Sequence, residues 1–168
     1  MKQADFRSKI MSLSDAVAQR AEWKNKGQKV VFTNGVFDLI HPGHVIYLAE
    51  AKAQGDKLIL GLNNDVSAKM LGKGSHRPIN HEEARAIVMA GLEMIDAIVL
   101  FGQSTPLELI TALNPDVLVK GGDYTIENIV GSDIVLDAGG EVLSLKFVDG
   151  YSTTAIEQKI VKAGLDKA

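Results

Sequence analysis

The sequence predicts an α/β fold, a doubly wound five-stranded parallel sheet with helices on both faces. Two observations carry this prediction. Short apolar runs rich in Val, Ile and Leu alternate with helical patterns along the chain. These runs lack strict apolar–polar alternation, which is typical of parallel strands covered on both faces. Because a doubly wound sheet binds ligands outside the carboxyl ends of its strands, the residues that follow each strand are the candidates for chemistry.

The first elements are a helix, a strand, a second helix and a second strand. The opening helix covers about 14–26 and ends near Gly27, since glycine commonly follows the last turn of a helix. A buried strand is predicted at 29–34, a helix at about 43–54, and another buried strand at 57–62.

The next helix has an apolar face and precedes the third strand. Asn80 is predicted as its N-cap, with Glu83 completing a capping box. Apolar residues recur at helical spacing and predict the face that packs on the sheet; they are Ala84, Ile87, Val88, Leu92 and Ile95.

The second half of the chain repeats the alternation of strands and helices. Strands are predicted at 97–101, 116–120 and 141–147. Helices are predicted at 106–113 and 132–138, and a last helix begins near Thr153.

Length and composition indicate a single domain over 1–168, with its catalytic core at about 29–163. The absence of cysteine excludes disulfides, thiolate metal sites and cysteine nucleophiles. The apolar runs are too short to span a membrane, and the charged N-terminus is not a secretory signal, so we expect a cytoplasmic location. A net charge of −3 argues against a nucleic-acid partner. We expect the protein to bind small-molecule substrates and to have no nucleic-acid or membrane partner. Assembly into a homo-oligomer stays an open alternative.

The first strand leads into a motif with two histidines. His41 and His44 are three residues apart, separated by Pro42 and Gly43, at the start of a helix. A helix N-terminus offers free N–H groups and a positive dipole end, which suit phosphate. Gly43 lets the backbone approach a ligand closely. The residues alone leave two alternatives, a capping and a surface histidine, or a metal site that lacks a clustered third ligand.

A cationic loop at 69–78 follows the second strand. It holds four potentially cationic side chains, Lys69, Lys73, His76 and Arg77. Phosphoryl transfer depends mainly on positioning and charge stabilisation, so such a loop suits a triphosphate. A solvated mobile loop is the alternative. Arg85, in the following helix, reads as a surface residue from the sequence alone.

Two further segments follow strands. Lys120 and Gly121 begin the run Lys-Gly-Gly-Asp-Tyr, whose glycines permit close approach of a ligand. An ordinary turn explains the run equally well. The last predicted helix begins at Ser152-Thr153-Thr154, which ordinary N-capping also explains.

The segment Gly35-x-Phe37-Asp38-x-x-His41-x-Gly43-His44 resembles the signature of the cytidylyltransferase-like nucleotidyltransferases. The resemblance implies a Rossmann-like fold and transfer of a nucleoside monophosphate to a phosphate or phosphonate acceptor. By this resemblance, the two histidines bind the triphosphate and stabilise the transition state. Asp38 is expected to anchor the motif. Mg²⁺ is expected to bind through the ATP phosphates, with no metal site built from the protein.

Within this superfamily, the chain resembles the adenylyltransferase domain of bacterial heptose-phosphate enzymes. The matching stretches include 31–35, 62–65, 77–80, 118–124 and 149–154. This resemblance implies that ATP and D-glycero-β-D-manno-heptose 1-phosphate are condensed to ADP-heptose and pyrophosphate, for lipopolysaccharide or other surface glycans. Relatives often have cysteine in place of Val36, so this position is expected to contribute its backbone.

The resemblance assigns roles residue by residue. The expected catalytic residues are His41, His44, Lys73 and Arg85. The expected nucleotide- and phosphate-binding residues are Asn34, Gly35, Phe37, Gly43, Lys69, Lys120, Gly121, Asp123, Ser152, Thr153 and Thr154. Two alternatives stay open: a cytidylyltransferase that uses CTP with glycerol 3-phosphate or a related phosphate, and a non-catalytic ATP-binding regulatory module.

Overall fold

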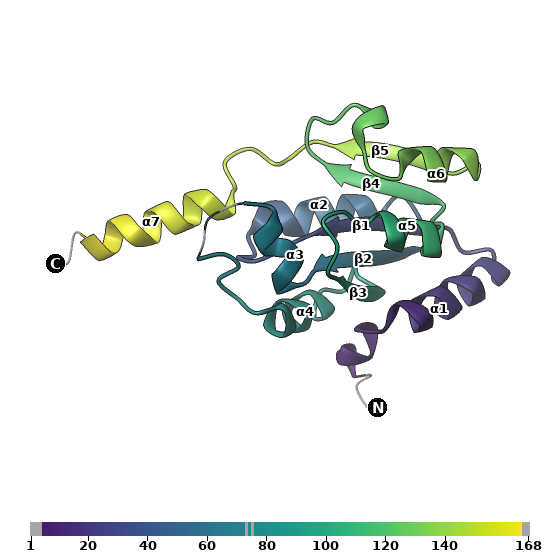
Figure 1. Ribbon diagram of the computed structural model, residues 1–168, viewed down its shortest axis with the longest axis horizontal. Coiled ribbons are helices and arrows are strands. Elements are labelled where there is room, and N and C mark those ends of the chain that lie inside the picture. The colour runs from purple at the N-terminus through teal and green to yellow at the C-terminus, as the bar shows by residue number, and fades with distance from the viewer. Residues whose placement is uncertain (1–4, 73, 75, 166–168) are drawn as a thin grey trace.

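A computed structural model describes residues 5–72, 74 and 76–165, and its centre is a five-stranded parallel sheet (Figure 1). The strands run in the order β3-β2-β1-β4-β5. They are β1 (Val30–Gly35), β2 (Lys57–Asn63), β3 (Ala97–Phe101), β4 (Val117–Gly121) and β5 (Glu141–Leu145). The predicted fold class is confirmed, because this order winds outwards from β1 in both directions.

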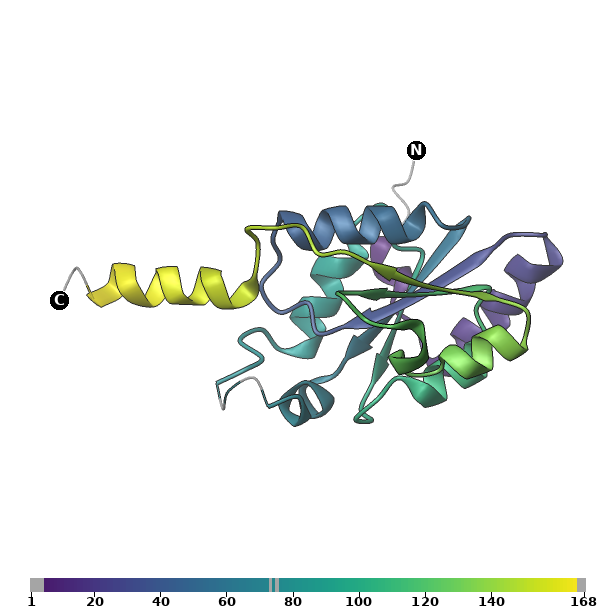
Figure 2. The ribbon, with the colours of Figure 1, turned by 90° about the horizontal axis from the view of Figure 1, so that it is seen from above.

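Helices cover both faces of the sheet, and Figure 2 shows these layers from above. One face is covered by α1 (Leu13–Asn25), α5 (Leu107–Leu113) and α6 (Ser132–Asp137), whose buried residues share a core cluster with Phe32 of β1. The opposite face is covered by α2 (Pro42–Lys52) and α4 (Glu82–Ala90), whose core cluster includes the adjacent Val31. Neighbouring strand residues therefore serve opposite cores, which explains the continuous apolar runs.

Three short helices were not predicted. The 3₁₀-helix η1 (Phe6–Lys9) precedes α1, and η2 (Ile126–Asn128) follows β4. The third is α3 (Asp65–Met70), which directly follows β2 and includes the start of the predicted cationic loop. Asn64 caps α3 by accepting a hydrogen bond from the backbone N–H of Ser67 at 2.9 Å. An amide side chain can thus start a helix too short for a visible apolar period.

The predicted N-cap of α4 is wrong, and its predicted apolar face is confirmed only in part. Ile95 is buried in the core and Leu92 packs against it, but both lie beyond the end of the helix. The helix begins at Glu82 with His81 at the N-cap position, because the Asn80 side chain is bonded elsewhere. The residues that α4 buries are Arg85, Ala86, Met89 and Ala90. Two residues of the predicted core face, Ile87 and Val88, are 40% and 51% exposed. The helix is therefore rotated so that an arginine, rather than the apolar stripe, faces inwards.

The centre of the sheet opens at its carboxyl edge. The ladder between β1 and β4 joins only Val31 to Val117 and Phe32 to Leu118, although both strands continue beyond these pairs. The neighbouring β1–β2 ladder extends over six residue pairs, as far as Gly35. Because the winding reverses between β1 and β4, their separation creates a crevice where doubly wound sheets bind ligands.

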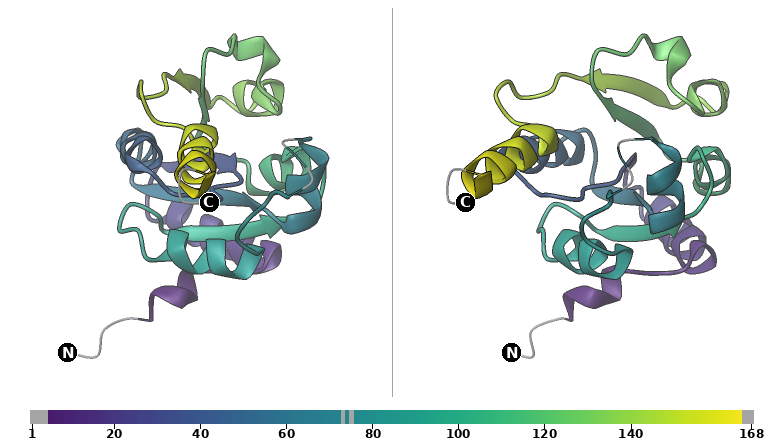
Figure 3. Two further views of the ribbon diagram at one scale, coloured as in Figure 1. Left: turned by 90° about the vertical axis from the view of Figure 1, so that its left-hand side faces the viewer. Right: turned by 60° about the vertical axis from the view of Figure 1, so that its left-hand side comes forward.

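The last helix, α7 (Thr153–Leu165), extends away from the body of the molecule (Figures 1 and 2). Figure 3 shows it in front of the carboxyl edge of the sheet. Its first turn therefore lies at the opening of the crevice, while its later residues Ile160 and Val161 are 63% and 57% exposed. Among the helices of the described residues, none combines the length and apolar character needed to cross a bilayer.

Candidate active site

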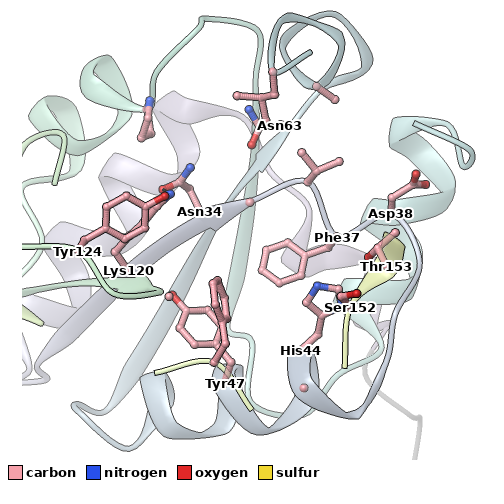
Figure 4. Close-up of a pocket in the computed structure, with 18 of the residues that line it drawn as sticks. Asn34, Phe37, Asp38, His44, Tyr47, Asn63, Lys120, Tyr124, Ser152 and Thr153 are labelled. Carbon is pink, nitrogen blue, oxygen red and sulfur yellow. Dashed lines mark hydrogen bonds between the residues drawn. The ribbon is translucent and has the colours of Figure 1, made fainter. Parts of the chain in front are cut away.

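A cavity of about 670 Å³ lies at the carboxyl ends of β1 and β4. Eleven of the residues predicted for the site line it: Asn34, Gly35, Phe37, His41, Gly43, His44, Lys120, Gly121, Ser152, Thr153 and Thr154. In Figure 4, Asn34, Lys120 and Tyr124 lie on one side, and His44, Ser152 and Thr153 lie on the other. Segments more than a hundred residues apart thus meet around one space.

The two histidines stack on each other at the start of α2. Their ring centroids are 3.7 Å apart and their planes differ by 17°. His41 takes the N-cap position, with Pro42 opening the helix, and its side chain makes no capping hydrogen bond. Phe37 lies edge-on to His44 at 5.1 Å between ring centroids. The two rings are therefore packed together, with Phe37 against His44, and the His41 side chain does not cap the helix.

Gly43 is fitted closely between this pair and the segment before α7. A Cβ atom at Gly43 would lie 3.1 Å from Nδ1 of His41 and 3.1 Å from Cβ of Tyr151. This small residue therefore lets the segment before α7 approach the first turn of α2.

Burial sets the charge of His41. It lowers the pKa of the His41 imidazole below its ordinary value, while a backbone hydrogen bond acts in the opposite direction. The ring is therefore neutral at pH 7 and can donate one hydrogen bond to a phosphoryl oxygen.

Asp38 fixes the histidine motif to the segment before α4. Its buried carboxylate accepts hydrogen bonds from the backbone N–H groups of Ile79 and Asn80, both at 2.8 Å. The Asn80 side chain donates to the Asp38 carbonyl at 2.9 Å, which explains why it does not cap α4. These three bonds support the expected anchoring role of Asp38, because they use both carboxylate oxygens within the protein.

Arg85 does not lie at the surface, and its side chain has no exposed area. Its guanidinium donates to the carbonyls of Asn80 (2.9 Å), Val36 (2.7 Å) and Asn63 (2.8 Å). It also pairs with the Asp65 carboxylate at 2.8 Å. The structure contradicts the expected contact between Arg85 and a phosphate. Arg85 does not line the cavity, and all three of its side-chain nitrogens donate to groups of the protein. The contact of Val36 through its carbonyl agrees with the expected backbone role of that residue.

Lys120 and Asn34 face each other across the opening between β4 and β1. Nζ of Lys120 donates to Oδ1 of Asn34 at 3.2 Å. The next residue, Gly121, is closely packed, because a Cβ atom there would lie 2.8 Å from the Phe147 ring and 3.1 Å from the Tyr47 ring. Asp123 is exposed and does not line the cavity, so the predicted binding role of Asp123 has no geometric support.

The hydroxyl groups before and within the first turn of α7 have different partners. Oγ of Ser152 accepts a hydrogen bond from the Ala155 N–H at 3.0 Å, as an N-cap does. Oγ1 of Thr153 donates to the Leu39 carbonyl at 3.3 Å, which ties α7 to the histidine motif. Oγ1 of Thr154 lies 3.4 Å from Nη2 of Arg77. The start of α7 therefore presents hydroxyl groups to the cavity beside a guanidinium.

The two predicted lysines of the loop before α4 are not both described. Lys69 is exposed near the end of α3 and does not line the cavity. Lys73 lies outside the described residues. Arg77, from the same loop, does line the cavity and was not among the assigned residues.

Other cavity residues were also missed by sequence reasoning. Tyr47 lies three positions after His44, one helical turn along α2. Its hydroxyl is 2.6 Å from Oγ1 of Thr33, and burial raises its pKa to about 12, so it stays protonated. Helical spacing from His44 could have identified it. Ser104 and Thr105 line the cavity from the loop after β3, where no motif marked them.

No group of three histidine, aspartate or glutamate side chains is arranged to hold a metal ion within the part of the chain that the structure describes.

Comparison with known families now identifies the class of protein. Residues 32–159 match the cytidylyltransferase-like family, and the chain belongs to it. The matched range includes the histidine motif, the cavity and the first turns of α7. Membership of the nucleotidyltransferase superfamily, predicted from the motif, is confirmed.

The chain is also similar to individual proteins of this family. It is 50% identical over 150 residues to the bifunctional protein HldE of Hyphomonas neptunium, covering 89% of this chain and 31% of that protein. It is 51% identical over 160 residues to the bifunctional protein HldE of Geobacter metallireducens, covering 95% of this chain and 32% of that protein. The chain thus spans about a third of the length of these curated relatives.

Two solved structures share the fold. The lipopolysaccharide core biosynthesis protein from Thermoplasma volcanium GSS1 is 26% identical with a TM-score of 0.59, covering 75% of this chain and 100% of that one. The pantoate-beta-alanine ligase from Francisella tularensis is 17% identical with a TM-score of 0.58, covering 88% of this chain and 75% of that one. The second likeness concerns the fold alone.

Proposed function

We propose that the chain joins ATP to D-glycero-β-D-manno-heptose 1-phosphate, giving ADP-heptose and pyrophosphate, for lipopolysaccharide or another surface glycan. The observation that carries this proposal is the stacked pair His41 and His44 at the start of α2, which lines one cavity beside the hydroxyls at the start of α7. Relatives about 50% identical to this chain over the aligned third of their length are named HldE, and a more distant relative is a lipopolysaccharide core biosynthesis protein. The second name supports an acceptor that is used in lipopolysaccharide synthesis.

The reaction is an in-line displacement at the α-phosphorus of ATP. A phosphate oxygen of the acceptor forms the new bond to this phosphorus, and the bond to the bridging oxygen of pyrophosphate breaks. Because a phosphate monoester is largely ionised at neutral pH, the nucleophile needs no general base. The task of the protein is therefore to align the two phosphates and to offset charge as it develops.

The histidines are suited to this task. Neutral His41 can donate a hydrogen bond to a phosphoryl oxygen, and the N-terminal N–H groups of α2 add a second set of donors. The His44 ring is stacked on the His41 ring, so it lies where it can contact the same phosphate groups. Mg²⁺ bound through the ATP phosphates would supply further charge neutralisation.

The other side of the cavity suits a polyhydroxylated acceptor. Asn34 and Lys120 lie on this side, and Asn128, Ser104 and Thr105 also line the cavity. Amide, ammonium and hydroxyl groups can bond sugar hydroxyls and a sugar phosphate. We therefore assign the acceptor to the side of Lys120 and the triphosphate to the side of the histidines and α7.

Adenine is assigned to the segment before α7. Val148 and Tyr151 line the cavity there, where backbone groups can read the edge of a purine. A site that bonds the edge of one base rejects another base, because polar groups are left unpaired. We expect kcat/KM for ATP to exceed that for CTP by about tenfold or more.

Pyrophosphate release with ATP, CTP, GTP and UTP, against a panel of sugar phosphates and glycerol 3-phosphate, tests the proposal. ATP with the heptose 1-phosphate should be the best pair. If the protein used CTP as well as ATP or better, the proposed activity would be that of a cytidylyltransferase instead of an adenylyltransferase. Binding of ATP without pyrophosphate release from any pair would indicate a regulatory module.

A further inference from the structure

Two charged side chains from distant parts of the chain meet at the edge of the cavity. Arg77 precedes α4, and Glu157 lies in the second turn of α7. Nη2 of Arg77 donates to one carboxylate oxygen of Glu157, and His76 contacts the other oxygen. The same Nη2 lies 3.4 Å from Oγ1 of Thr154. The loop before α4 is thus connected to the first turns of α7 by an arginine that also lines the cavity.

The guanidinium of Arg77 has donors that these contacts do not use. Its side chain is only 12% exposed, and Nη2 makes the contacts to both Thr154 and Glu157. Nε is buried and has no hydrogen-bond partner among the described residues. A buried guanidinium with an unused donor costs free energy, unless a ligand or water supplies an acceptor. The protein itself therefore satisfies the donors of Arg77 only in part.

Glu157 lies on the same side of α7 as the hydroxyl groups. It follows Thr153 by four positions and Thr154 by three, which places the three side chains on one helical face. The hydrogen bond from Arg77 holds the pKa of Glu157 below its ordinary value, so the side chain is a carboxylate at neutral pH. A carboxylate beside two hydroxyls that face phosphates would repel a nucleotide unless it moved away.

Arg77 supplies charge where the proposed triphosphate needs it. Of the described residues that line the cavity, only Arg77 and Lys120 are lysine or arginine. Lys120 lies with Asn34 and Tyr124 on the acceptor side (Figure 4). Arg77 contacts Thr154, next to Thr153 on the other side. The permanent positive charge on the triphosphate side therefore comes from Arg77.

We propose that Arg77 binds a phosphate group of the nucleotide, and that Glu157 occupies its guanidinium in the empty site until the phosphate displaces it. This inference rests on the proposed function. A guanidinium bonds carboxylate and phosphate with the same planar set of donors, so the two anions compete for one partner. The phosphates carry more charge than one carboxylate, and ion pairs near the surface add little net free energy. The nucleotide therefore wins the competition.

Displacement predicts opposite effects for the two partners. Arg77→Ala should weaken the binding of magnesium pyrophosphate about tenfold or more, because a charge-assisted contact is lost. Glu157→Gln should tighten it about threefold, because the competing charge is removed and the side chain keeps its shape. In the double variant Arg77→Ala with Glu157→Gln, the second change should increase the affinity for magnesium pyrophosphate less than it does alone. The reason is that no guanidinium remains for Glu157 to occupy. A purely structural ion pair predicts weaker binding from both single changes.

Calorimetric titration of the full chain with magnesium pyrophosphate, and with ATP and Mg²⁺, measures these effects. Arg7→Ala and Glu93→Gln are matched controls, because they make the same charge changes at exposed positions away from the cavity and should bind as the wild type does. Circular dichroism checks the fold of each variant. Weaker binding by Glu157→Gln, or unchanged binding by Arg77→Ala, would overturn the proposal.

The titration separates this inference from the proposed function, since binding needs no turnover. If the wild type releases pyrophosphate while Arg77→Ala binds and turns over normally, the function stands and the role of Arg77 is lost. If the wild type binds neither pyrophosphate nor ATP, both fail. If it binds both ligands with the predicted opposite effects but releases no pyrophosphate, the phosphate site stands and the transferase does not.

Discussion

Replacing Arg85 by alanine should destabilise the whole domain. The guanidinium is buried and bonds three backbone carbonyls, which belong to the segment after β1, to the last residue of β2 and to the segment before α4. It also pairs with the Asp65 carboxylate. Alanine would leave these acceptors without donors inside the protein and would open a cavity behind the histidine motif.

The size of the effect follows from these contacts. Removing one partner of a buried ion pair costs about 3–5 kcal/mol, because the remaining charge is left uncompensated. We expect about 4 kcal/mol for Arg85→Ala, a large part of a typical total of about 5–15 kcal/mol. In a domain of this size each kcal/mol lowers Tm by about 2–4 °C, so Tm should fall by about 8–16 °C. Arg85→Lys should recover only part of this, since an ammonium cannot serve all four acceptors.

Thermal and urea unfolding followed by circular dichroism measure this loss, and pyrophosphate release is measured on the same samples below the transition. Arg7→Ala, at an exposed position, is the control. If Arg85→Ala melted within about 2 °C of the wild type and yet lost its turnover, Arg85 would act on the substrate and the structural role inferred from its burial would be wrong.

Three further predictions concern the histidines, the cavity wall and pH. His44→Ala should lower kcat on the order of 10²-fold with a smaller change in KM, measured by pyrophosphate release, because its donor acts chiefly in the transition state. Gly121→Ala should raise KM in steady-state kinetics with little change in kcat, because the new methyl group displaces the rings that line the cavity. Asp96→Asn should lower the free energy of unfolding by about 1–3 kcal/mol at pH 7 in urea titrations, and by much less below about pH 3.

The pH dependence follows from the contacts of Asp96. Burial raises its pKa, but hydrogen bonds from Lys52, the Leu58 N–H and Lys57 together outweigh burial and hold the pKa below its ordinary value. A carboxyl group with a lowered pKa stabilises the fold above its unfolded pKa of about 3.9, and this stability is lost as pH falls through the folded pKa. The wild type and Asp96→Asn should therefore converge in acid. A constant difference down to pH 2 would contradict the role of the charge.

Controls distinguish the other two effects from general damage. His81→Ala removes a histidine whose side chain is 92% exposed, and it should leave kcat unchanged. Gly164→Ala adds a methyl group where nothing lies within 4 Å, and it should leave KM unchanged. Near-normal kcat in His44→Ala would remove the catalytic role of that residue. An unchanged KM in Gly121→Ala would show that the neighbouring rings can move aside without affecting the binding of the substrate.

The strands and most of the cavity could be predicted from the sequence, for one physical reason. Parallel strands buried on both faces need continuous apolar runs, and their carboxyl ends meet at a single edge. This geometry predicts where the site lies, whereas the family resemblance assigned individual residues such as Asn34 and Lys120. These two residues lie near the carboxyl ends of β1 and β4, and the structure brings them within hydrogen-bonding distance.

Buried charge could not be predicted in this way. The apolar stripe of α4 suggested one face, whereas the helix buries Arg85 because carbonyls up to 49 residues away accept its hydrogen bonds. Apolar periodicity contains no information about such distant acceptors. The pair Arg77 and Glu157 was missed for the same reason, since it joins positions 80 residues apart.

The short ladder between β1 and β4 has a mechanical consequence for the site. Backbone hydrogen bonds are extensive within β3-β2-β1 and within β4-β5, whereas only two residue pairs are in register between these groups. The histidines follow β1 on one side of this seam, and Lys120 belongs to β4 on the other. Tilting the two groups against each other would therefore widen or narrow the gap between nucleotide and acceptor, while each group kept its own ladder intact. The seam of the sheet with the fewest paired residues is thus where the proposed reaction would bring the two phosphates together.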